Sequence, residues 1–220
     1  ETIKELVLFG YAWSAQCSWN IAGSDLSKFS KIYFYDFFGI DDSRLPKMYE
    51  TFSNSFNQMM WHEVWRHPLL PVRNPEWWEA RMSPVGRINW MNWTMPNLLK
   101  DIEELKPKVK KNRDHLDILN YFVRFNNWYK MKLETQLLID NEKILTPEFI
   151  ALVEKNIAEL KTLRDDYKTI WLRYYKPENL NMIMDKFNRL IQYFEESKNN
   201  LESPLIKSDW IYVKNSDTTF

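Results

Sequence analysis

The sequence predicts an all-α protein, built as an antiparallel bundle of long amphipathic helices. Apolar residues recur at the three- and four-residue spacing of a helix through most of the 220 residues. Only 4 glycines occur, which leaves few positions for the positive-φ turns that sheets and phosphate-binding loops need. Three of the apolar stripes are long and are joined by short turns, as in bundles whose helices cross at a shallow angle.

The composition excludes several classes of function. Hydrophobic residues make up 45% and charged residues 27%, which are proportions of a globular domain. The 30 basic residues balance the 30 acidic ones, so no net field attracts nucleic acid or an anionic membrane. We find no signal peptide and no apolar run long enough to predict a membrane span. The single cysteine permits no internal disulfide.

The first two predicted helices cover residues 2–16 and 26–38. Asp25, or the serine before it, is a suitable N-cap for the second helix, and Gly39 is a suitable stop. The chain opens inside a helix. We therefore interpret residues 1–40 as the terminal helices of an upstream, barrel-type domain.

The stretch GYAWSAQCSWN contains two tryptophans, two serines and the lone cysteine. Phe9 and Trp13 share one helix face, and Trp19 follows near the end of the helix, so we expect the aromatic rings to seal this end against a neighbour. Ser14 and Ser18 are expected to satisfy backbone groups. The cysteine has no cationic neighbour and is expected to be an inert thiol.

Residues 41–207 are predicted to form the bundle. Its first helix follows the aspartate and serine at 42–43 and ends before Pro68. Residues 68–94 contain four prolines among many aromatic residues, so an irregular segment folded against the helices is expected. Thr94 is predicted to cap the next helix, with Pro96 in its first turn.

Three long helices complete the predicted bundle. They are expected to begin at Pro107, to follow an N-cap at Thr146, and to begin at Leu180. Residues 208–220 form a tail that either pairs as a single strand or lies loose.

The sequence WHEVWRHP resembles a zinc-protease motif but lacks its spacing. That motif places two histidines four residues apart, on one helix face, whereas His62 and His67 are five apart and diverge. No third ligand is evident, and no metal or cofactor is predicted. Adjacent acidic pairs occur on predicted helices, where their side chains point apart, so no catalytic carboxylate pair is assigned.

The abundance of tryptophan leaves two alternatives open. Tryptophan faces stack on the apolar faces of sugar rings, so a row of them in a groove forms a carbohydrate platform. Helical bundles also bury tryptophan in their cores. The candidate platform residues are Trp65, Trp77, Trp78 and Trp90.

Two stretches carry a family resemblance. Residues 166–196, DYKTIWLRYYKPENLNMIMDKFNRLIQYFEE, contain a Pro-Glu-x-Leu turn followed by a Phe-x-x-Leu helix. This region resembles the C-terminal helical region of bacterial family 20 glycoside hydrolases, the β-N-acetylhexosaminidase type. The opening, from its Trp-Ser-Ala turn to Phe-Phe-Gly-Ile-Asp at 37–41, is similar to the end of that family's catalytic barrel. Family 84 hydrolases share this layout.

The resemblance implies an enzyme that removes terminal N-acetylhexosamine with help from an adjacent Asp-Glu pair. No Asp-Glu dipeptide occurs in the sequence, so no catalytic residue can be assigned to this chain. The resemblance thus implies a non-catalytic C-terminal domain, in the periplasm or outside the cell, that supports an upstream catalytic domain. The alternatives are a carbohydrate-binding module or a helical interaction scaffold. The flank of the long helices is a candidate homodimer surface.

Overall fold

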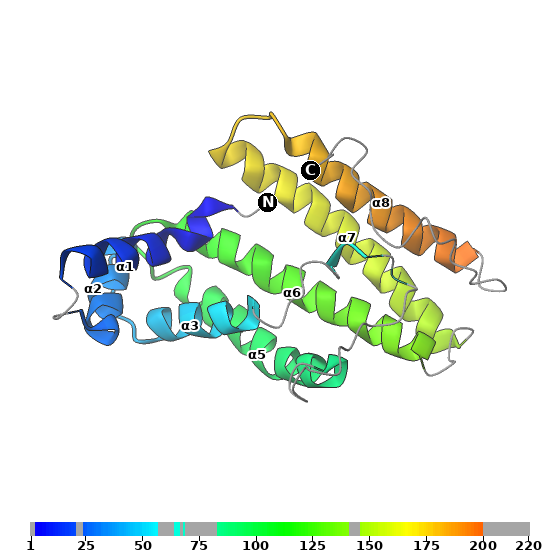
Figure 1. Cartoon of the computed structure of the whole chain (residues 1–220), viewed down its shortest axis with the longest axis horizontal. Coiled ribbons are helices and arrows are strands. Elements are labelled where there is room, and N and C mark those ends of the chain that lie inside the picture. Colours follow the sequence, from blue (N-terminus) through cyan, green and yellow to red (C-terminus); the bar gives the residue numbers. More distant parts are fainter. Residues whose placement is uncertain are drawn as a thin grey trace.

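In the computed structural model, the described residues form one short 3-10 helix and seven α-helices (Figure 1). The description covers residues 3–20, 24–56, 64–66, 68, 83–140 and 146–199. The predicted all-α fold is confirmed. The derivation of the first helices from a barrel stays a prediction, and the tail at 208–220 lies outside the described residues.

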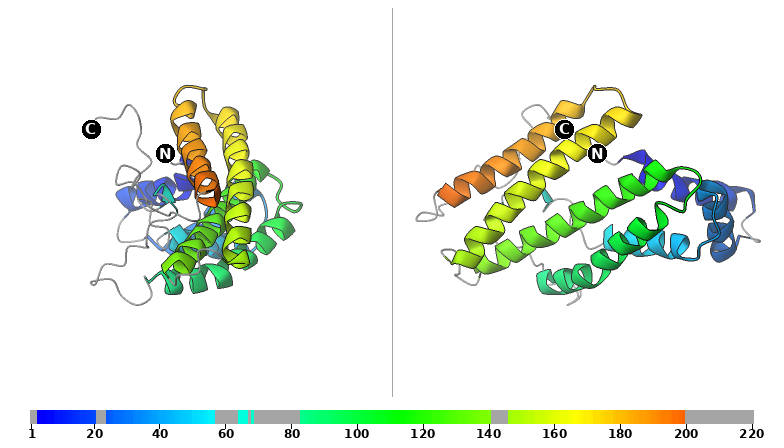
Figure 2. Two further views of the ribbon diagram at one scale, coloured as in Figure 1. Left: turned by 90° about the vertical axis from the view of Figure 1, so that its right-hand side faces the viewer. Right: turned by 180° about the vertical axis from the view of Figure 1, so that it is seen from behind.

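Four helices form the bundle: α5 (Pro84–Leu105), α6 (Arg113–Asp140), α7 (Pro147–Tyr174) and α8 (Leu180–Asn199). Each packs against the next one in the sequence, and the view from behind shows them side by side in that order (Figure 2). Short connections force neighbouring helices to run antiparallel. The helix α6 lies at the centre, because it also contacts elements from the N-terminal part of the chain.

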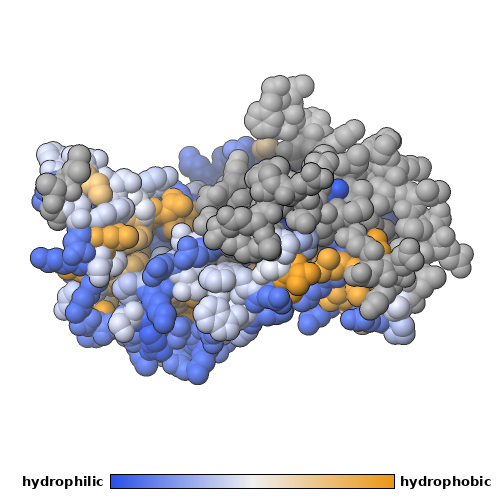
Figure 3. All heavy atoms as spheres, turned by 60° about the horizontal axis from the view of Figure 1, so that its bottom comes forward, coloured by the Kyte–Doolittle hydropathy of each residue, from blue (hydrophilic) through white to orange (hydrophobic). Residues whose placement is uncertain are grey.

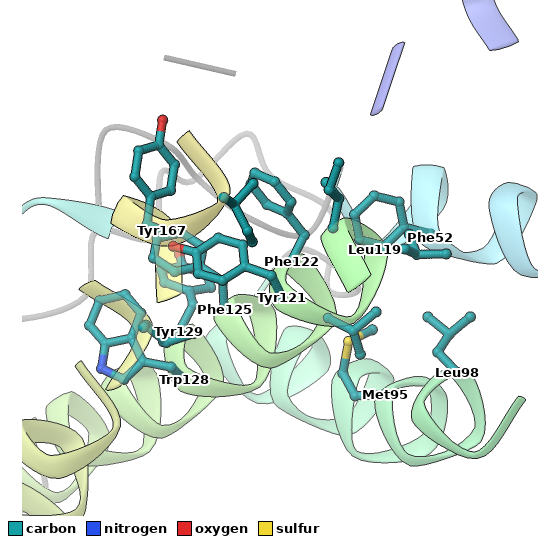
Figure 4. Close-up of a cluster of buried hydrophobic side chains, with 14 of the residues drawn as sticks. Phe52, Met95, Leu98, Leu119, Tyr121, Phe122, Phe125, Trp128, Tyr129 and Tyr167 are labelled. Atoms are coloured by element: carbon teal, nitrogen blue, oxygen red, sulfur yellow. The ribbon is translucent and has the colours of Figure 1, made fainter. Parts of the chain in front are cut away.

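Aromatic side chains fill the middle of the bundle. Trp128 and Tyr129 of α6 are fully buried, and the ring of Phe125 lies 5.3 Å from that of Trp128 (Figure 4). Tyr167 reaches this cluster from α7, with its ring 5.8 Å from that of Tyr121. Burying such a ring contributes roughly 1.5–3 kcal/mol. Much of the unusual aromatic content therefore belongs to the core.

The helix α7 begins where the sequence predicts. Thr146 accepts a hydrogen bond from the backbone N–H of Phe149 at 3.2 Å, and Pro147 occupies the first helical position. At the other end, the indole N–H of Trp171 donates to the Lys176 carbonyl at 2.7 Å, which holds the turn into α8. This turn carries the Pro-Glu-x-Leu motif of the family resemblance.

The prediction of an irregular segment as far as residue 94 is wrong. The helix α5 already begins at Pro84, after Ser83, whose hydroxyl accepts a hydrogen bond from the Gly86 N–H at 3.1 Å. Thr94 is not a cap but lies within the helix, where its hydroxyl donates to the Trp90 carbonyl. Pro96 is also inside the helix, and burial of the apolar face offsets the backbone hydrogen bond that proline removes.

The long helix predicted from Pro107 begins later, at Arg113. Residues 106–112 instead form a turn that meets the end of α2 (Leu26–Phe38). The N–H groups of Lys110 and Lys111 both donate to the Phe38 carbonyl, at 2.9 and 3.2 Å. The sequence pattern could not show this contact, because it joins segments more than 70 residues apart.

The first helices form an arm at one end of the bundle, at the left of Figure 1. We define the N-terminal arm as η1 (Lys4–Val7), α1 (Leu8–Trp19) and α2. The helix α3 (Arg44–Phe56) leads from the arm back along α5. Arg44 fixes the start of α3, since its guanidinium donates to Asp42 and, at 2.7 Å, to Glu104 of α5.

The arm turns into the bundle at Gly39. Its φ of 71° lies in the left-handed region, and its N–H closes α2 by donating to the Tyr35 carbonyl at 2.8 Å. A Cβ added there would lie 3.1 Å from the Cβ of Lys110. Gly10, by contrast, lies inside α1, and a Cβ added there would meet no atom within 4 Å.

These two glycines give a matched pair of substitutions. Gly39→Ala should lower the free energy of unfolding by about 1–2 kcal/mol, because alanine is strained in the left-handed region. Gly10→Ala should raise it by about 0.5–1 kcal/mol, because alanine favours a helix interior. Urea titration followed by circular dichroism measures both. Equal effects of the two substitutions would contradict the turn described here.

Candidate docking surface

Within the described part of the chain, the side of α1 that faces solvent is an unusual surface. No residue of α1 is buried, and no charged residue occurs between Glu5 and Asp25. Trp19 is 90% exposed and Tyr11 is 65% exposed. We name this surface the outer face of α1, and its residues, all exposed, are Gly10, Tyr11, Ser14, Ala15, Ser18 and Trp19.

The other side of α1 packs against α2 through aromatic rings. The ring of Phe9 lies 5.0 Å from that of Phe34 in a stacked arrangement, and the ring of Trp13 lies 5.3 Å from that of Phe29. Contacts of this kind stabilise a helix pair by about 0.5–1.5 kcal/mol each beyond the area they bury. The outer face of α1 is thus held rigidly in place and is available to a partner.

The stretch GYAWSAQCSWN forms most of this surface, and its predicted roles are partly confirmed. The Ser18 hydroxyl donates to the Ser14 carbonyl at 2.8 Å, as expected for a backbone-satisfying serine. Cys17 is a half-buried free thiol. The prediction that Trp19 seals the helix end is wrong, because the helix ends at Trp19 itself and the ring points into solvent.

Figure 3 shows how the surface chemistry changes along the molecule. Pale and orange side chains lie at its left-hand end, where the arm lies, a second orange group lies right of centre, and the lower left edge is mostly blue. The charged side chains of the bundle form ion pairs between helices, such as Arg124 of α6 with Glu159 and Asp166 of α7, at 3.1 and 2.7 Å. Solvent-facing parts of the bundle therefore carry charged pairs beside some exposed apolar side chains such as Trp93, whereas α1 carries no charged residue.

Polar contacts join the arm to the bundle at Tyr175, the residue that follows α7. Its hydroxyl donates to the Glu5 carboxylate at 2.5 Å and accepts from the Lys4 backbone N–H at 2.9 Å. Burial, together with the hydrogen bond to Glu5, raises the pKa of Tyr175 to about 12. The phenol therefore remains a neutral donor over the whole physiological pH range. These contacts fix η1, and through it α1, on the bundle.

His115 lies at the second junction between arm and bundle. Its ring meets Phe37 of α2 edge-on at 4.8 Å and lies 6.4 Å from the ring of Tyr174 of α7. Burial lowers the pKa of His115, and the nearby Asp114 and Glu5 carboxylates only partly oppose this shift. The neutral imidazole is therefore the form that the folded junction favours.

Two of the four predicted platform tryptophans lie within the described residues. Trp65 is half-buried, and its ring meets Phe187 of α8 edge-on at 5.2 Å. Trp90 is also half-buried, with its indole nitrogen inside the protein and its ring 6.0 Å from that of Trp93. Trp77 and Trp78 lie outside the described residues, so the platform stays a prediction.

The predicted metal and acid motifs can be followed only in part. His62 and His67 lie outside the described residues. Within the described part of the chain, no three His, Cys, Asp or Glu side chains could hold a metal ion, and no helix could span a membrane. Asp165 and Asp166 bond different arginines, Arg164 and Arg124, as expected for acids whose side chains diverge.

The fold and this surface define an all-α bundle with an aromatic, uncharged helix displayed at one end. No known protein family, curated protein or solved structure matches the chain. The resemblance to family 20 glycoside hydrolases therefore stays a prediction.

Sequence reasoning identified α1 as a helix but missed its exposed side. The sequence has no charged residue between Glu5 and Asp25, whereas a helix with one solvent face normally carries charged residues on that face. This lack of charge is the feature that could have indicated the exposed side of α1. The spacing of apolar residues does not reveal the exposed side of α1, because aromatic residues occur on both sides of this helix.

The junction at His115 predicts a dependence of stability on pH. The unfolded chain binds the imidazole proton near pH 6.5, whereas the folded protein binds it only at lower pH, so the free energy of unfolding should fall as pH drops from 7.5 to about 5.5. His115→Gln should flatten this part of the curve, as measured by urea titration across the range. An unchanged slope in the variant would contradict a buried neutral histidine at the junction.

Proposed function

We propose that this chain is a non-catalytic helical domain that supports the catalytic domain of a secreted glycoside hydrolase acting on N-acetylhexosamine-containing glycans. The observation that carries the docking role is the outer face of α1. We propose that this face packs against the catalytic domain, which precedes Glu1 in the longer protein. The bundle would then hold α1 and α2 rigidly against the catalytic domain.

The physical argument for docking is the contrast between α1 and the other helices. Burial of apolar surface stabilises a protein by roughly 25 cal/mol per Å², and α1 realises this gain on one side only. The exposed Tyr11 and Trp19 are of the residue types enriched at the centre of protein interfaces, and the lack of charge on this face matches the depletion of charged residues there. A domain joined to the same chain would meet this surface at high effective concentration.

The argument for a glycoside hydrolase rests on the resemblance of residues 166–196 and of the opening stretch. The positions that carry it have packing roles here: Trp171 and Tyr175 hold the α7–α8 turn and the arm, and Phe187 packs in the core. A supporting domain needs such residues and no reacting carboxylates. This agrees with the lack of an Asp-Glu dipeptide in the sequence.

The proposal predicts different behaviour for the chain alone and for the longer protein. The 220-residue chain should release no 4-nitrophenol from 4-nitrophenyl N-acetyl-β-D-glucosaminide, whereas the longer protein should release it. In the longer protein, Trp19→Asp should lower the temperature at which activity is lost, because it places a charge in the interface. The same substitution should leave the unfolding midpoint of the isolated chain unchanged.

Trp93→Asp is the matched control, since Trp93 is 68% exposed on α5, away from the arm. It should leave the inactivation temperature of the longer protein unchanged. Turnover by the isolated chain would refute the non-catalytic role. If sedimentation instead shows a dimer of the isolated chain that Trp19→Asp dissociates, the outer face of α1 binds a second copy, and the interaction-scaffold alternative replaces the docking role.

A further inference from the structure

A polar cleft of about 560 Å³ lies between α2 and the start of α3. Its walls are the Ser27–Tyr35 part of α2, the connection at Ile40–Ser43, and Pro46 of α3. At 100° per residue, Lys31 and Tyr35 lie on a different side of α2 from Phe29 and Tyr33, which contact α1. The cleft is therefore separate from the outer face of α1.

The cleft offers an aromatic face beside a small apolar wall. Tyr35 lines it and is 54% exposed, which leaves its ring accessible to a ligand. Ile40 and Pro46 line the same space. Sugar rings carry C–H groups on their faces that pack on such a ring, with the tyrosine hydroxyl directed toward water.

Three charged side chains of the cleft can form hydrogen bonds with a ligand without breaking bonds within the protein. Within the described part of the chain, the side chains of Lys28, Lys31 and Asp41 form no ion pair or hydrogen bond. Asp42 is different, because its two oxygens accept hydrogen bonds from the Arg44 side chain at 3.0 and 2.8 Å. Two ammonium groups and a carboxylate around an aromatic ring match the alternating hydroxyl donors and acceptors of a sugar.

The balance of charge indicates a neutral ligand. Lys28 and Lys31 are offset by Asp41 and by Asp25, whose carboxylate accepts the Lys28 backbone N–H at 3.1 Å as the N-cap of α2. Asp42 pairs with Arg44, which also pairs with Asp101 and Glu104 of α5. A cleft built for an anion would carry an excess of positive charge, which this one lacks.

We infer that this cleft binds one neutral hexose or N-acetylhexosamine unit of a glycan, stacked on Tyr35, with Lys28, Lys31 and Asp41 bonding its hydroxyl groups. Only the inclusion of the N-acetylated sugar rests on the proposed function. The site differs from the predicted tryptophan platform, since it uses none of the four tryptophans. It would hold a glycan chain on the supporting domain while another part of that chain is cleaved elsewhere.

The test is a titration of the isotopically labelled 220-residue chain with N,N′-diacetylchitobiose and with cellobiose, followed by NMR. At least one disaccharide should shift the amide signals of residues 27–43, with a dissociation constant in the millimolar range. Tyr35→Ala should weaken binding about tenfold or more, because the stacking face is lost. Tyr35→Phe should retain it, because the ring remains.

Tyr11→Ala is the matched control, because Tyr11 is an exposed tyrosine of the same arm outside the cleft. It should bind like the unsubstituted chain. An unfolding midpoint unchanged in Tyr35→Ala would show that the variant is folded. Three results would overturn the inference: no binding at about 10 mM of either disaccharide, equal binding by Tyr35→Ala, or displacement of both sugars by inorganic phosphate. None of these results bears on turnover or on docking of α1.

Discussion

Burial of α6 over most of its circumference is the constraint on which the rest of the structure depends. Val123, Trp128 and Tyr129 point in different directions from the helix axis, and all three are fully buried, while a narrow stripe that includes Arg124 and Glu134 stays partly exposed. A helix that is buried on most sides needs neighbours on most sides. The helices α5 and α7 cover two sides, and η1 and α3 contact it as well. Long flanking helices and a returning N-terminal part are therefore necessary consequences of the composition of α6.

Buried polar groups determine how these neighbours lie against α6. Lys132 is fully buried, and its ammonium donates to the carbonyls of Val64 and Arg66 at 2.9 and 2.7 Å, which fixes that segment on the helix. Arg87 of α5 donates to the Tyr129 hydroxyl at 2.8 Å. A buried charge without such bonds costs several kcal/mol, so a shifted helix register would be strongly disfavoured. Apolar packing thus supplies most of the stability, and these few bonds select one arrangement.

The sequence predicted the fold best where structure is determined locally. The cap at Thr146 and the start of α8 at Leu180 depend on neighbouring residues, and both lie at the predicted positions. The start of α5 was misplaced because Thr94 and Pro96 match a helix start by local pattern, while burial of Met91 and Met95 extends the helix through them. The outer face of α1 and the cleft depend on which side of α1 and α2 meets a neighbour. No local pattern specifies that choice, since the rings on both sides of α1 are chemically alike.

The arm combines two surfaces of opposite chemistry on one helix pair. The outer face of α1 is uncharged, and it excludes water once a protein surface covers it. The cleft beside α2 keeps free ammonium and carboxylate groups, which lose their hydration without compensation if a protein surface covers them. The helix α1 packs on one side of α2, and the cleft lies on another side of α2. A protein that docks on the outer face of α1 would therefore leave the cleft open to solvent. If the proposed docking and the inferred sugar site both hold, this separation, fixed by the stacked rings of Phe9 and Phe34, would let one small arm hold a neighbouring domain and a glycan at the same time.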